Sequence, residues 1–451
     1  MSDTASNVVP IAAGTRALVL GLGRTGVSVA RYLQRKGVDV RVADTRATPP
    51  GVDKLRASVP QAELRTGAFE SSLLDGVAHV VISPGLSLQQ PLVREALARG
   101  LPVVGDIELF AREACASVAA VTGTNGKSTV TTLVAELAAA GRRRTLAGGN
   151  LGEPALDLLE QPVPDLYVLE LSSFQLETTQ TLRTVTATVL NLTPDHMDRY
   201  GSLAEYGAAK ARIFDGCDVA VINADDPLVR AMPRPGQAVV SFSLVSRDAD
   251  YTLEHSPEPM IVRRGEPLLP LQSMRLQGLH NAANAMAALA MVEALGLPLA
   301  PALEALCAFG GLPHRSQWVA DVGGVRYVND SKGTNVGATL AAVQGMPGPL
   351  VVIAGGDGKN QDFADLRAAF RGKVRHVVLI GRDADALAET LAGICSTERA
   401  LDMAAAVRAA QQVAQPGDTV LLSPACASLD MFRDYTHRGD EFAAAVRSLA
   451  A

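Results

Sequence analysis

The chain has 451 residues, a length that corresponds to two to four domains of roughly 100–200 residues each. Hydrophobic residues make up 48% of it and charged residues 20%, so each domain can bury a core, and the net charge of -6 argues against nucleic acid as the main partner. The five cysteines are scattered without C-x-x-C spacing, which indicates neither a disulfide framework nor a zinc site. No stretch approaches the ~20 apolar residues that span a bilayer, so we expect a cytoplasmic chain without membrane insertion. Aromatic residues are only 4% of the chain, and we expect a monomer.

The first block of the chain has the pattern of a small doubly wound domain. A strand predicted over residues 16–20 is followed by G-L-G-R-T-G at 21–26 and by a helical segment. A second predicted strand, 38–43, ends at Asp44, where dinucleotide folds place the acid that binds ribose hydroxyls. Taken alone, this motif indicates NAD with low specificity. Two further strands are predicted at 79–82 and 101–104, so we assign residues 1–106 to one domain.

A phosphate-binding loop opens the second block, residues 107–311. The sequence T-G-T-N-G-K-S-T at 122–129 follows a β-branched run and precedes a helix predicted over 130–140. Glycines let backbone N–H groups close around phosphate oxygens, Lys127 can reach the terminal phosphates, and the Ser128 hydroxyl can bind Mg²⁺. The strict pattern would have glycine at position 121, where this chain has Val121. We predict that the loop binds a nucleoside triphosphate.

Two further polar segments follow predicted strands of the same block. Glu170 comes directly after the apolar run 166–169, in the position of a second Mg²⁺ anchor beside a phosphate loop. His196 lies between two aspartates in N-L-T-P-D-H-M-D at 191–198, after another strand. This histidine either binds a metal or phosphate or has a structural role.

The third block, residues 312–451, repeats the alternation of strands and helices. Arg315 either reaches a transferring phosphoryl group or pairs with a surface carboxylate. The segments at 329–335 and 355–359 are amide- or glycine-rich turns that each carry a lysine, which suits anion recognition. Cys426 has no evident histidine partner, and we do not expect it to be a nucleophile. The economical interpretation of the whole chain is three α/β domains.

Many of these segments, in this order, resemble the Mur ligases of peptidoglycan precursor synthesis. The resemblance runs from the glycine motif to the segment R-G-D-E-F at 438–442, and it is closest to the glutamate-adding members around Lys359 and Ser428. It implies an N-terminal Rossmann-like UDP-binding domain, a central P-loop ATPase-type domain and a C-terminal Rossmann-like domain that binds glutamate. The matching segments are those at 122–129, 169–177, 195–200, 311–315, 329–332 and 423–430.

The resemblance implies ATP-dependent amide formation. The carboxylate of UDP-N-acetylmuramoyl-L-alanine would attack the γ-phosphate, and the glutamate amine would then displace phosphate from the acyl phosphate. It implies one Mg²⁺ on Ser128 and Glu170 and a second on His196 and a carbamylated Lys210, with Lys332 directed toward the substrate. The implied catalytic residues are Lys127, His196, Lys210, Arg315 and Lys332. The implied ATP contacts are Gly123, Thr124, Asn125, Gly126, Lys127, Ser128, Thr129, Asn284, Arg315 and Asp330.

The resemblance also implies sites for the other two substrates. The implied UDP-substrate contacts are Gly23, Arg24, Thr25, Asp44, Thr45, Arg46, Ser83, Pro84, Gly85 and Asn150. The implied glutamate contacts are Thr334, Lys359, Ser428, Leu429 and Tyr435. Tyr435 stands where the resemblance leads us to expect phenylalanine. The implied amino acid is D-glutamate, but the sequence itself does not distinguish it from L-glutamate.

Two functions of other classes explain part of the sequence. A nicotinamide dehydrogenase would account for the glycines at 21–26 but leaves the phosphate loop, Glu170 and His196 unexplained. An ATP-hydrolysing switch would use the same loop but would need no amino acid. Folylpolyglutamate synthesis is a related ligase reaction, against which the UDP-like features of the first domain argue.

For the ligase we expect a hinge at 310–313 that closes the third domain over the nucleotide.

Overall fold

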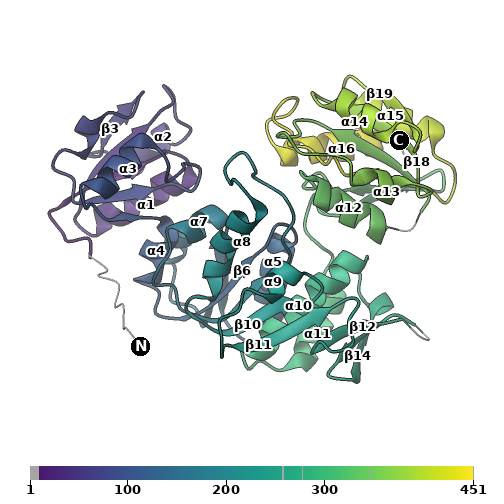
Figure 1. Ribbon diagram of the computed structural model, residues 1–451, viewed down its shortest axis with the longest axis horizontal. Coiled ribbons are helices and arrows are strands. Elements are labelled where there is room, and N and C mark those ends of the chain that lie inside the picture. Colours follow the sequence, from purple (N-terminus) through teal and green to yellow (C-terminus); the bar gives the residue numbers. More distant parts are fainter. Residues whose placement is uncertain (1–9, 256–257, 277, 347, 450–451) are drawn as a thin grey trace.

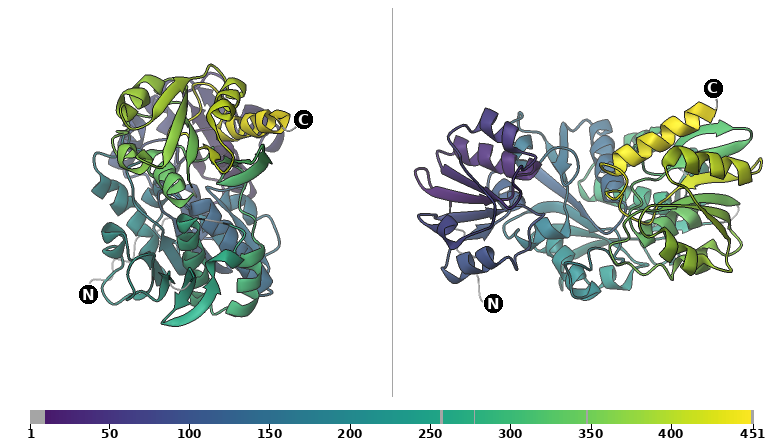
Figure 2. Two further views of the ribbon diagram at one scale, coloured as in Figure 1. Left: turned by 90° about the vertical axis from the view of Figure 1, so that its right-hand side faces the viewer. Right: turned by 90° about the horizontal axis from the view of Figure 1, so that it is seen from above.

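The computed structural model describes residues 10–255, 258–276, 278–346 and 348–449, so the beginning of the expected first domain and the end of the expected third domain lie outside the described residues. Three sheets, each accompanied by helices, form three lobes (Figure 1). The first lobe, in purple, and the third, in green to yellow, stand on either side of the teal middle lobe, and the view from above shows them in a row (Figure 2). Three α/β units confirm the predicted fold class. Within the described residues, no helix is both long and apolar enough to cross a bilayer.

The first lobe has a parallel five-stranded sheet in the order β3-β2-β1-β4-β5. The chain leaves β1 toward β2 on one side and returns to β4 on the other, so the ends of β1 and β4 form the crevice where doubly wound folds bind ligands. Its elements are β1 (Arg16–Leu20), α1 (Arg24–Arg35), β2 (Asp39–Asp44), α2 (Val52–Ser58), β3 (Glu63–Thr66), η1 (Ser71–Leu74), β4 (His79–Ile82), α3 (Pro91–Ala98) and β5 (Val103–Val104).

The middle lobe has a nine-stranded sheet in the order β14-β13-β12-β11-β10-β9-β6-β8-β7. Strands β9, β6 and β8 are adjacent and parallel, so the segments that follow them meet at one edge. The elements are α4 (Asp106–Ala111), β6 (Ser117–Thr122), α5 (Lys127–Ala140), β7 (Thr145–Gly149), α6 (Ala155–Leu158), β8 (Leu166–Glu170), α7 (Ser173–Glu177), β9 (Thr184–Val189), α8 (Leu203–Ala211), η2 (Arg212–Phe214), β10 (Cys217–Asn223), α9 (Pro227–Arg230), β11 (Ala238–Ser243), β12 (Tyr251–Glu254), β13 (Met260–Arg263), β14 (Glu266–Pro270), η3 (Leu271–Ser273), α10 (Leu279–Ala294) and α11 (Leu299–Ala308).

The third lobe has a six-stranded sheet in the order β15-β16-β20-β17-β18-β19, in which only β15 is antiparallel to its neighbour among the described strands. The elements are β15 (Gln317–Val322), β16 (Val325–Asn329), α12 (Val336–Gly345), β17 (Leu350–Gly355), α13 (Leu366–Phe370), β18 (Val374–Ile380), α14 (Ala384–Leu391), β19 (Ser396–Arg399), α15 (Met403–Val413), β20 (Thr419–Leu422) and α16 (Tyr435–Leu449).

The position of helix α10 explains its alanine-rich sequence. It packs against α5 and α11 of its own lobe and against α12 of the third lobe. Its residues from Ala285 to Val292 are all buried, so the helix has no solvated face there. Small side chains let neighbouring elements approach it closely from several directions. The helix thereby forms part of the wall between the second and third lobes.

Local geometry shifts several predicted boundaries. Helix α5 begins at Lys127, three residues before the prediction, because Gly126 adopts φ +84° and caps the helix at the end of the phosphate loop. Strand β8 includes Glu170, which the prediction placed just after the strand. Strand β5 is limited to Val103–Val104 and is shorter than predicted.

Candidate active site

Side-chain hydrogen bonds fix the conformation of the phosphate loop between β6 and α5. Asn191, which follows β9, accepts the Asn125 N–H at 2.8 Å and donates to the Asn125 carbonyl at 3.0 Å. Gly126 must be glycine, because a Cβ there would lie 2.5 Å from Oδ1 of Asn284. Lys127 Nζ folds over the loop and donates to the carbonyls of Gly123 and Thr124 at 2.9 and 2.7 Å. Burial lowers the Lys127 pKa.

Glu170 and Ser128 form an oxygen-rich pair at the start of α5. The Ser128 hydroxyl donates to Oε2 of Glu170, and Asn150 Nδ2 donates to Oε1 at 2.6 Å. Glu170 is 3% exposed. A hydroxyl and a carboxylate beside a phosphate loop are the hard oxygen ligands that Mg²⁺ prefers, so these residues fit the ion that the sequence predicted.

Lys210 and His196 lie on the other side of the loop. Lys210 on α8 is 1% exposed, and its Nζ donates to the Gly123 carbonyl at 2.8 Å. Burial, followed by the nearby Lys127 charge, lowers the pKa of Lys210 well below its usual value. A neutral amine is the form that adds CO₂, so the lowered pKa favours the form of this lysine that carbamylation needs. Burial also lowers the His196 pKa, which favours the neutral imidazole, the form that binds a metal.

Only small sets of metal-binding side chains occur here. Within the described residues, no group of three or more His, Cys, Asp and Glu side chains could hold a metal ion. This fits Mg²⁺, which is commonly bound by one or two protein carboxylates while waters and substrate phosphates supply the other ligands. Ser128 with Glu170 is an incomplete set of that kind.

Arg315 reaches this site from the third lobe. Its Nη2 donates to Ser128 Oγ at 2.6 Å. The residues on both sides of it, His314 and Ser316, have positive φ angles of 62° and 47°. The Ser316 N–H donates a hydrogen bond to Oδ1 of Asp330 at 3.0 Å. Positive φ is unfavourable for residues other than glycine, so this backbone is maintained by the contacts around it. It directs Arg315 across the boundary between lobes.

The cavity around these residues has a volume of about 300 Å³. Its described lining includes the lysines and arginine of the predicted catalytic set and only two carboxylates, Glu170 and Asp195. Burial and then the charges of Arg315 and Lys127 lower the Lys332 pKa to about 8. The excess of positive charge indicates a strongly anionic ligand, such as a polyphosphate.

A second cavity, of about 270 Å³, adjoins the first at the boundary with the third lobe. Asn284 of α10 and Asp330 after β16, two of the implied ATP contacts, line it. Burial raises the Asp330 pKa to about 6. The cavity shares Asn125, Gly126, Arg315 and Lys332 with the cationic cavity.

A third cavity, of about 400 Å³, lies at the crevice of the first lobe. Asp44 accepts the Leu22 N–H at 2.7 Å, and its hydrogen bonds with Arg46 lower its pKa to about 2. All ten predicted UDP-substrate residues line this cavity, namely Gly23, Arg24, Thr25, Asp44, Thr45, Arg46, Ser83, Pro84, Gly85 and Asn150.

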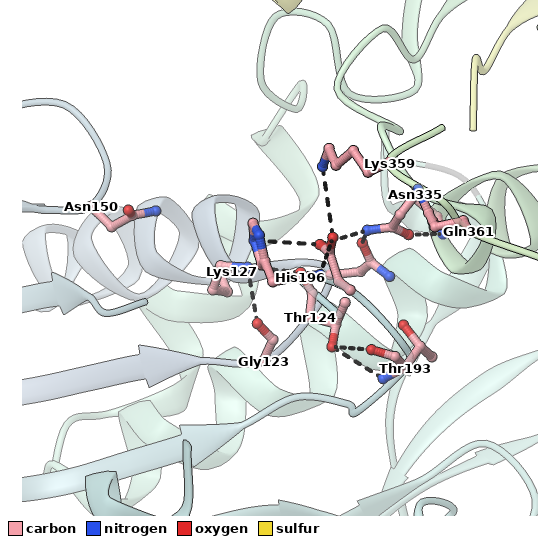
Figure 3. Close-up of polar contacts among 12 residues, drawn as sticks. Gly123, Thr124, Lys127, Asn150, Thr193, His196, Asn335, Lys359 and Gln361 are labelled. Atoms are coloured by element: carbon pink, nitrogen blue, oxygen red, sulfur yellow. Dashed lines mark hydrogen bonds and ion pairs between the residues drawn. The ribbon is translucent and has the colours of Figure 1, made fainter. Parts of the chain in front are cut away.

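Asn150 joins the third cavity to the cationic one, because it lines both. In the close-up it stands apart from the loop residues, on the side away from Asn335 and Lys359 (Figure 3). The three cavities therefore form a series, from the crevice of the first lobe through the cationic centre to the boundary with the third lobe.

The structure brings together only some of the predicted glutamate contacts. Thr334 and Lys359 line the cationic cavity. Tyr435 lies near it, with its ring centroid 4.1 Å from Lys332 Nζ. Ser428 is buried and Leu429 is 73% exposed, and neither is among the described residues lining the three cavities. Burial raises the Cys426 pKa to about 12, which agrees with our expectation that it is no nucleophile.

Two residues that act across the lobes, Asp195 and Asn335, were not predicted as site residues. Asp195 lies 3.7 Å from Lys359 Nζ and accepts a hydrogen bond from Asn335 Nδ2 at 3.2 Å. Figure 3 shows Asn335 and Lys359 of the third lobe facing His196 and Thr124 of the middle lobe. Each of these residues was visible in a polar segment after a strand, but their pairing depends on how the lobes meet.

Known domain families match all three lobes. Residues 15–105 match the Mur ligase MurD-like N-terminal domain, residues 121–292 the Mur ligase middle domain, and residues 314–426 the Mur ligase glutamate ligase domain. The chain belongs to the Mur ligase family. The family and the fold class of this Mur ligase both agree with the predictions made from its sequence.

Curated relatives align with this Mur ligase over nearly their whole length. UDP-N-acetylmuramoylalanine--D-glutamate ligase of Nitrosococcus oceani is 52% identical over 436 residues, 96% of each chain. The enzyme of the same name from Pseudomonas aeruginosa is 48% identical over 439 residues, 96% of this chain and 98% of the relative.

Solved structures share the three-lobed fold. UDP-N-acetylmuramate-alanine ligase MurC from Thermotoga maritima has a TM-score of 0.58 at 22% identity, covering 96% of this Mur ligase and 99% of that chain. MurF from Acinetobacter baumannii has a TM-score of 0.60 at 18% identity, covering 97% and 91%. At these identities the likeness concerns the fold alone.

Proposed function

We propose that this Mur ligase joins D-glutamate to UDP-N-acetylmuramoyl-L-alanine with ATP, forming ADP and phosphate, in peptidoglycan precursor synthesis. Relatives that carry this name are about half identical to it over nearly the whole chain. The observation that carries the proposal is the series of three cavities, because a ligase must hold a nucleotide and a UDP-linked acid on either side of one cationic centre.

The reaction proceeds in two steps that both develop negative charge. The alanyl carboxylate attacks the γ-phosphorus of ATP, the bond between that phosphorus and the β–γ bridging oxygen breaks, and ADP leaves as the acyl phosphate forms. The amine of glutamate then attacks the acyl carbon, and phosphate leaves as the nitrogen loses a proton. Lys127 and Arg315 stabilise charge on the phosphoryl oxygens, and Lys332 stabilises it near the acyl group, within a site that is largely buried.

Mur ligases use ATP and Mg²⁺, and Mg²⁺ supplies neutralisation of phosphate charge when it is bound. Ser128 and Glu170 would hold one ion. We propose that His196 and a carbamate on Lys210 hold a second. The burial and lowered pKa of the Lys210 amine support that modification, since addition of the amine to CO₂ gives a carboxylate-like ligand.

Several finer assignments belong to the same proposal. The division at 1–106, 107–311 and 312–451 assigns UDP-substrate, ATP and glutamate binding to successive domains. Thr334 and Lys359 would bind glutamate with Ser428, Leu429 and Tyr435 after the third domain closes at the expected hinge, 310–313. We also propose that the enzyme acts as a monomer in the cytoplasm.

The decisive experiment measures phosphate release from ATP with Mg²⁺ and UDP-N-acetylmuramoyl-L-alanine, comparing no amino acid, D-glutamate and L-glutamate. We expect release that depends on D-glutamate. Dependence on L-glutamate alone would overturn the stereochemical assignment. Release that ignores both isomers would instead favour an ATP-hydrolysing switch.

A further inference from the structure

Arg199 connects the first lobe to the middle lobe beside two of the cavities. Its Nη1 donates to the Pro84 carbonyl at 2.8 Å, and its Nη2 donates to the Leu86 carbonyl at 2.9 Å. Pro84 and Leu86 belong to the turn after β4 that lines the UDP-substrate cavity. The arginine itself belongs to the segment that follows β9 in the middle lobe.

The guanidinium is held on its middle-lobe side as well. Nη2 lies 3.1 Å from Oε2 of Glu177, and the guanidinium carbon lies 3.8 Å from the centroid of the Phe174 ring. The Arg199 side chain is 13% exposed. The guanidinium thus donates to two carbonyls, pairs with a carboxylate and stacks on an aromatic ring. Lysine lacks the planar group and could make only some of these contacts.

The same support continues to the proposed metal ligands. The Phe174 ring, over which the Arg199 guanidinium lies, also contacts His196 with ring centroids 5.0 Å apart. It stacks on Tyr200 with ring centroids 5.9 Å apart. Tyr200 donates to Glu177, the carboxylate that pairs with Arg199. A movement of the turn after β4 would thus be transmitted through Arg199 to the ring that packs on His196.

Other polar links between these two lobes involve α1 and its C-terminal end rather than the turn after β4. Ser28 and Tyr32 of α1 are 2% and 7% exposed and donate to Asp157 and Glu113. Arg35, the last residue of α1, and Lys36 after it pair with Glu160 and Glu113, and both of these basic side chains are 44% exposed. Solvated ion pairs of this kind contribute little energy and tolerate small displacements. Arg199 is the better candidate for a mechanical connection because its partners are backbone carbonyls of a substrate-binding turn.

We propose that Arg199 is a positioning residue that couples occupancy of the UDP-substrate cavity to the affinity of the phosphate site for ATP. The proposal rests on the proposed function. Binding of the UDP substrate would fix the turn after β4, and Arg199 would then hold the His196 segment in the arrangement that the nucleotide and its Mg²⁺ require. By linkage, ATP would raise the affinity for the UDP substrate by the same factor.

The test measures four dissociation constants by calorimetry with full-length protein. A non-hydrolysable ATP analogue with Mg²⁺ is titrated with and without UDP-N-acetylmuramoyl-L-alanine, and the substrate is titrated with and without the analogue. For the native protein we expect about fivefold or more coupling in both directions. For Arg199→Met and Arg199→Lys we expect coupling to fall toward onefold while the affinity for the analogue alone changes less than threefold.

Arg212→Met is the matched control. Arg212 also donates to two backbone carbonyls, those of Leu176 and Thr179 at 2.8 and 2.7 Å, but both lie in its own lobe. We expect this variant to keep the native coupling factor even if its melting temperature falls. Thermal unfolding of all variants separates loss of coupling from loss of structure.

The possible outcomes separate this inference from the proposed function. Coupling in Arg199→Met equal to that of the native protein would overturn the inference, as would equal loss in Arg212→Met or absence of coupling in the native protein. A native protein that binds the analogue but not the UDP substrate would overturn the proposed function and the inference with it.

Discussion

Arg315 of the third lobe donates a hydrogen bond to Ser128 of the phosphate loop, although the two residues are 187 positions apart in the sequence. The contact brings a guanidinium to the residue that is also expected to bind Mg²⁺. An arginine that approaches from a separate domain can withdraw and return, so its charge is available at the phosphates only when the domains are together.

Replacing Arg315 should therefore affect chemistry more than binding. We expect Arg315→Ala to lower kcat by about 10²-fold to 10³-fold, the usual loss when one charge-stabilising donor is removed. Phosphate-release kinetics measure this, with Arg326→Ala as control because Arg326 is half exposed on β16 and pairs with Asp321. A change in KM for ATP with an unchanged kcat would contradict the assignment.

Lys210 should carry CO₂ when the enzyme is active. We expect a carbamate signal in ¹³C NMR of native protein equilibrated with ¹³C-bicarbonate, and its absence in Lys210→Arg, whose kcat should fall about 100-fold or more. Lys373→Arg is the control: burial also lowers the Lys373 pKa, but its Nζ donates to Gln344 at an exposed site. Full activity of Lys210→Arg would exclude a role for the carbamate.

The pH dependence of kcat/KM for ATP should report the ionisation of Lys332. Its pKa is lowered to about 8, so the ammonium charge is present below pH 8 and is lost as the pH rises through that value. We expect kcat/KM for ATP to decline above about pH 8, because this parameter reports groups of the free enzyme. In Lys332→Arg the decline should move to higher pH. The same basic limb in both proteins would assign it to another group.

Asp106 should make stability depend on pH. Burial raises its pKa from 3.8 to about 6, so the folded state binds the proton more tightly than the unfolded state. The associated stability is fully present below about pH 4 and is lost as the pH rises through 6, by about 3 kcal/mol in total. We expect Asp106→Asn to lack this decline.

The comparison is made by urea unfolding of native protein and Asp106→Asn at several pH values between 4 and 7. The difference between the two proteins matters, because a three-domain chain need not unfold in one step. Parallel pH profiles would show that Asp106 ionises without the influence of its buried surroundings.

Local pattern predicted much of the fold and part of the site. Strands 16–20 and 79–82 have the predicted bounds, because the apolar runs there are buried in a parallel sheet. The phosphate loop and Glu170 were predictable for a related reason, since residues that follow parallel strands gather at one edge of a sheet.

The hairpin between β13 and β14 was not predicted. Its turn residues, Arg264 and Gly265, both have positive φ, of 48° and 81°, but arginine is not the asparagine or aspartate that marks such turns. The contacts of Lys359 with Asp195 and of Arg199 with Pro84 were missed for another reason. They depend on how lobes pack, and hydrophobic periodicity reports only how each segment folds.

Asn150 has a consequence for inhibition. Because it faces both the UDP-substrate cavity and the cationic cavity, a small molecule anchored on its amide would exclude two substrates together. Escape by substitution at this position would forfeit the hydrogen bond that orients Glu170. Resistance through this residue would therefore come at the expense of the enzyme's own metal ligand.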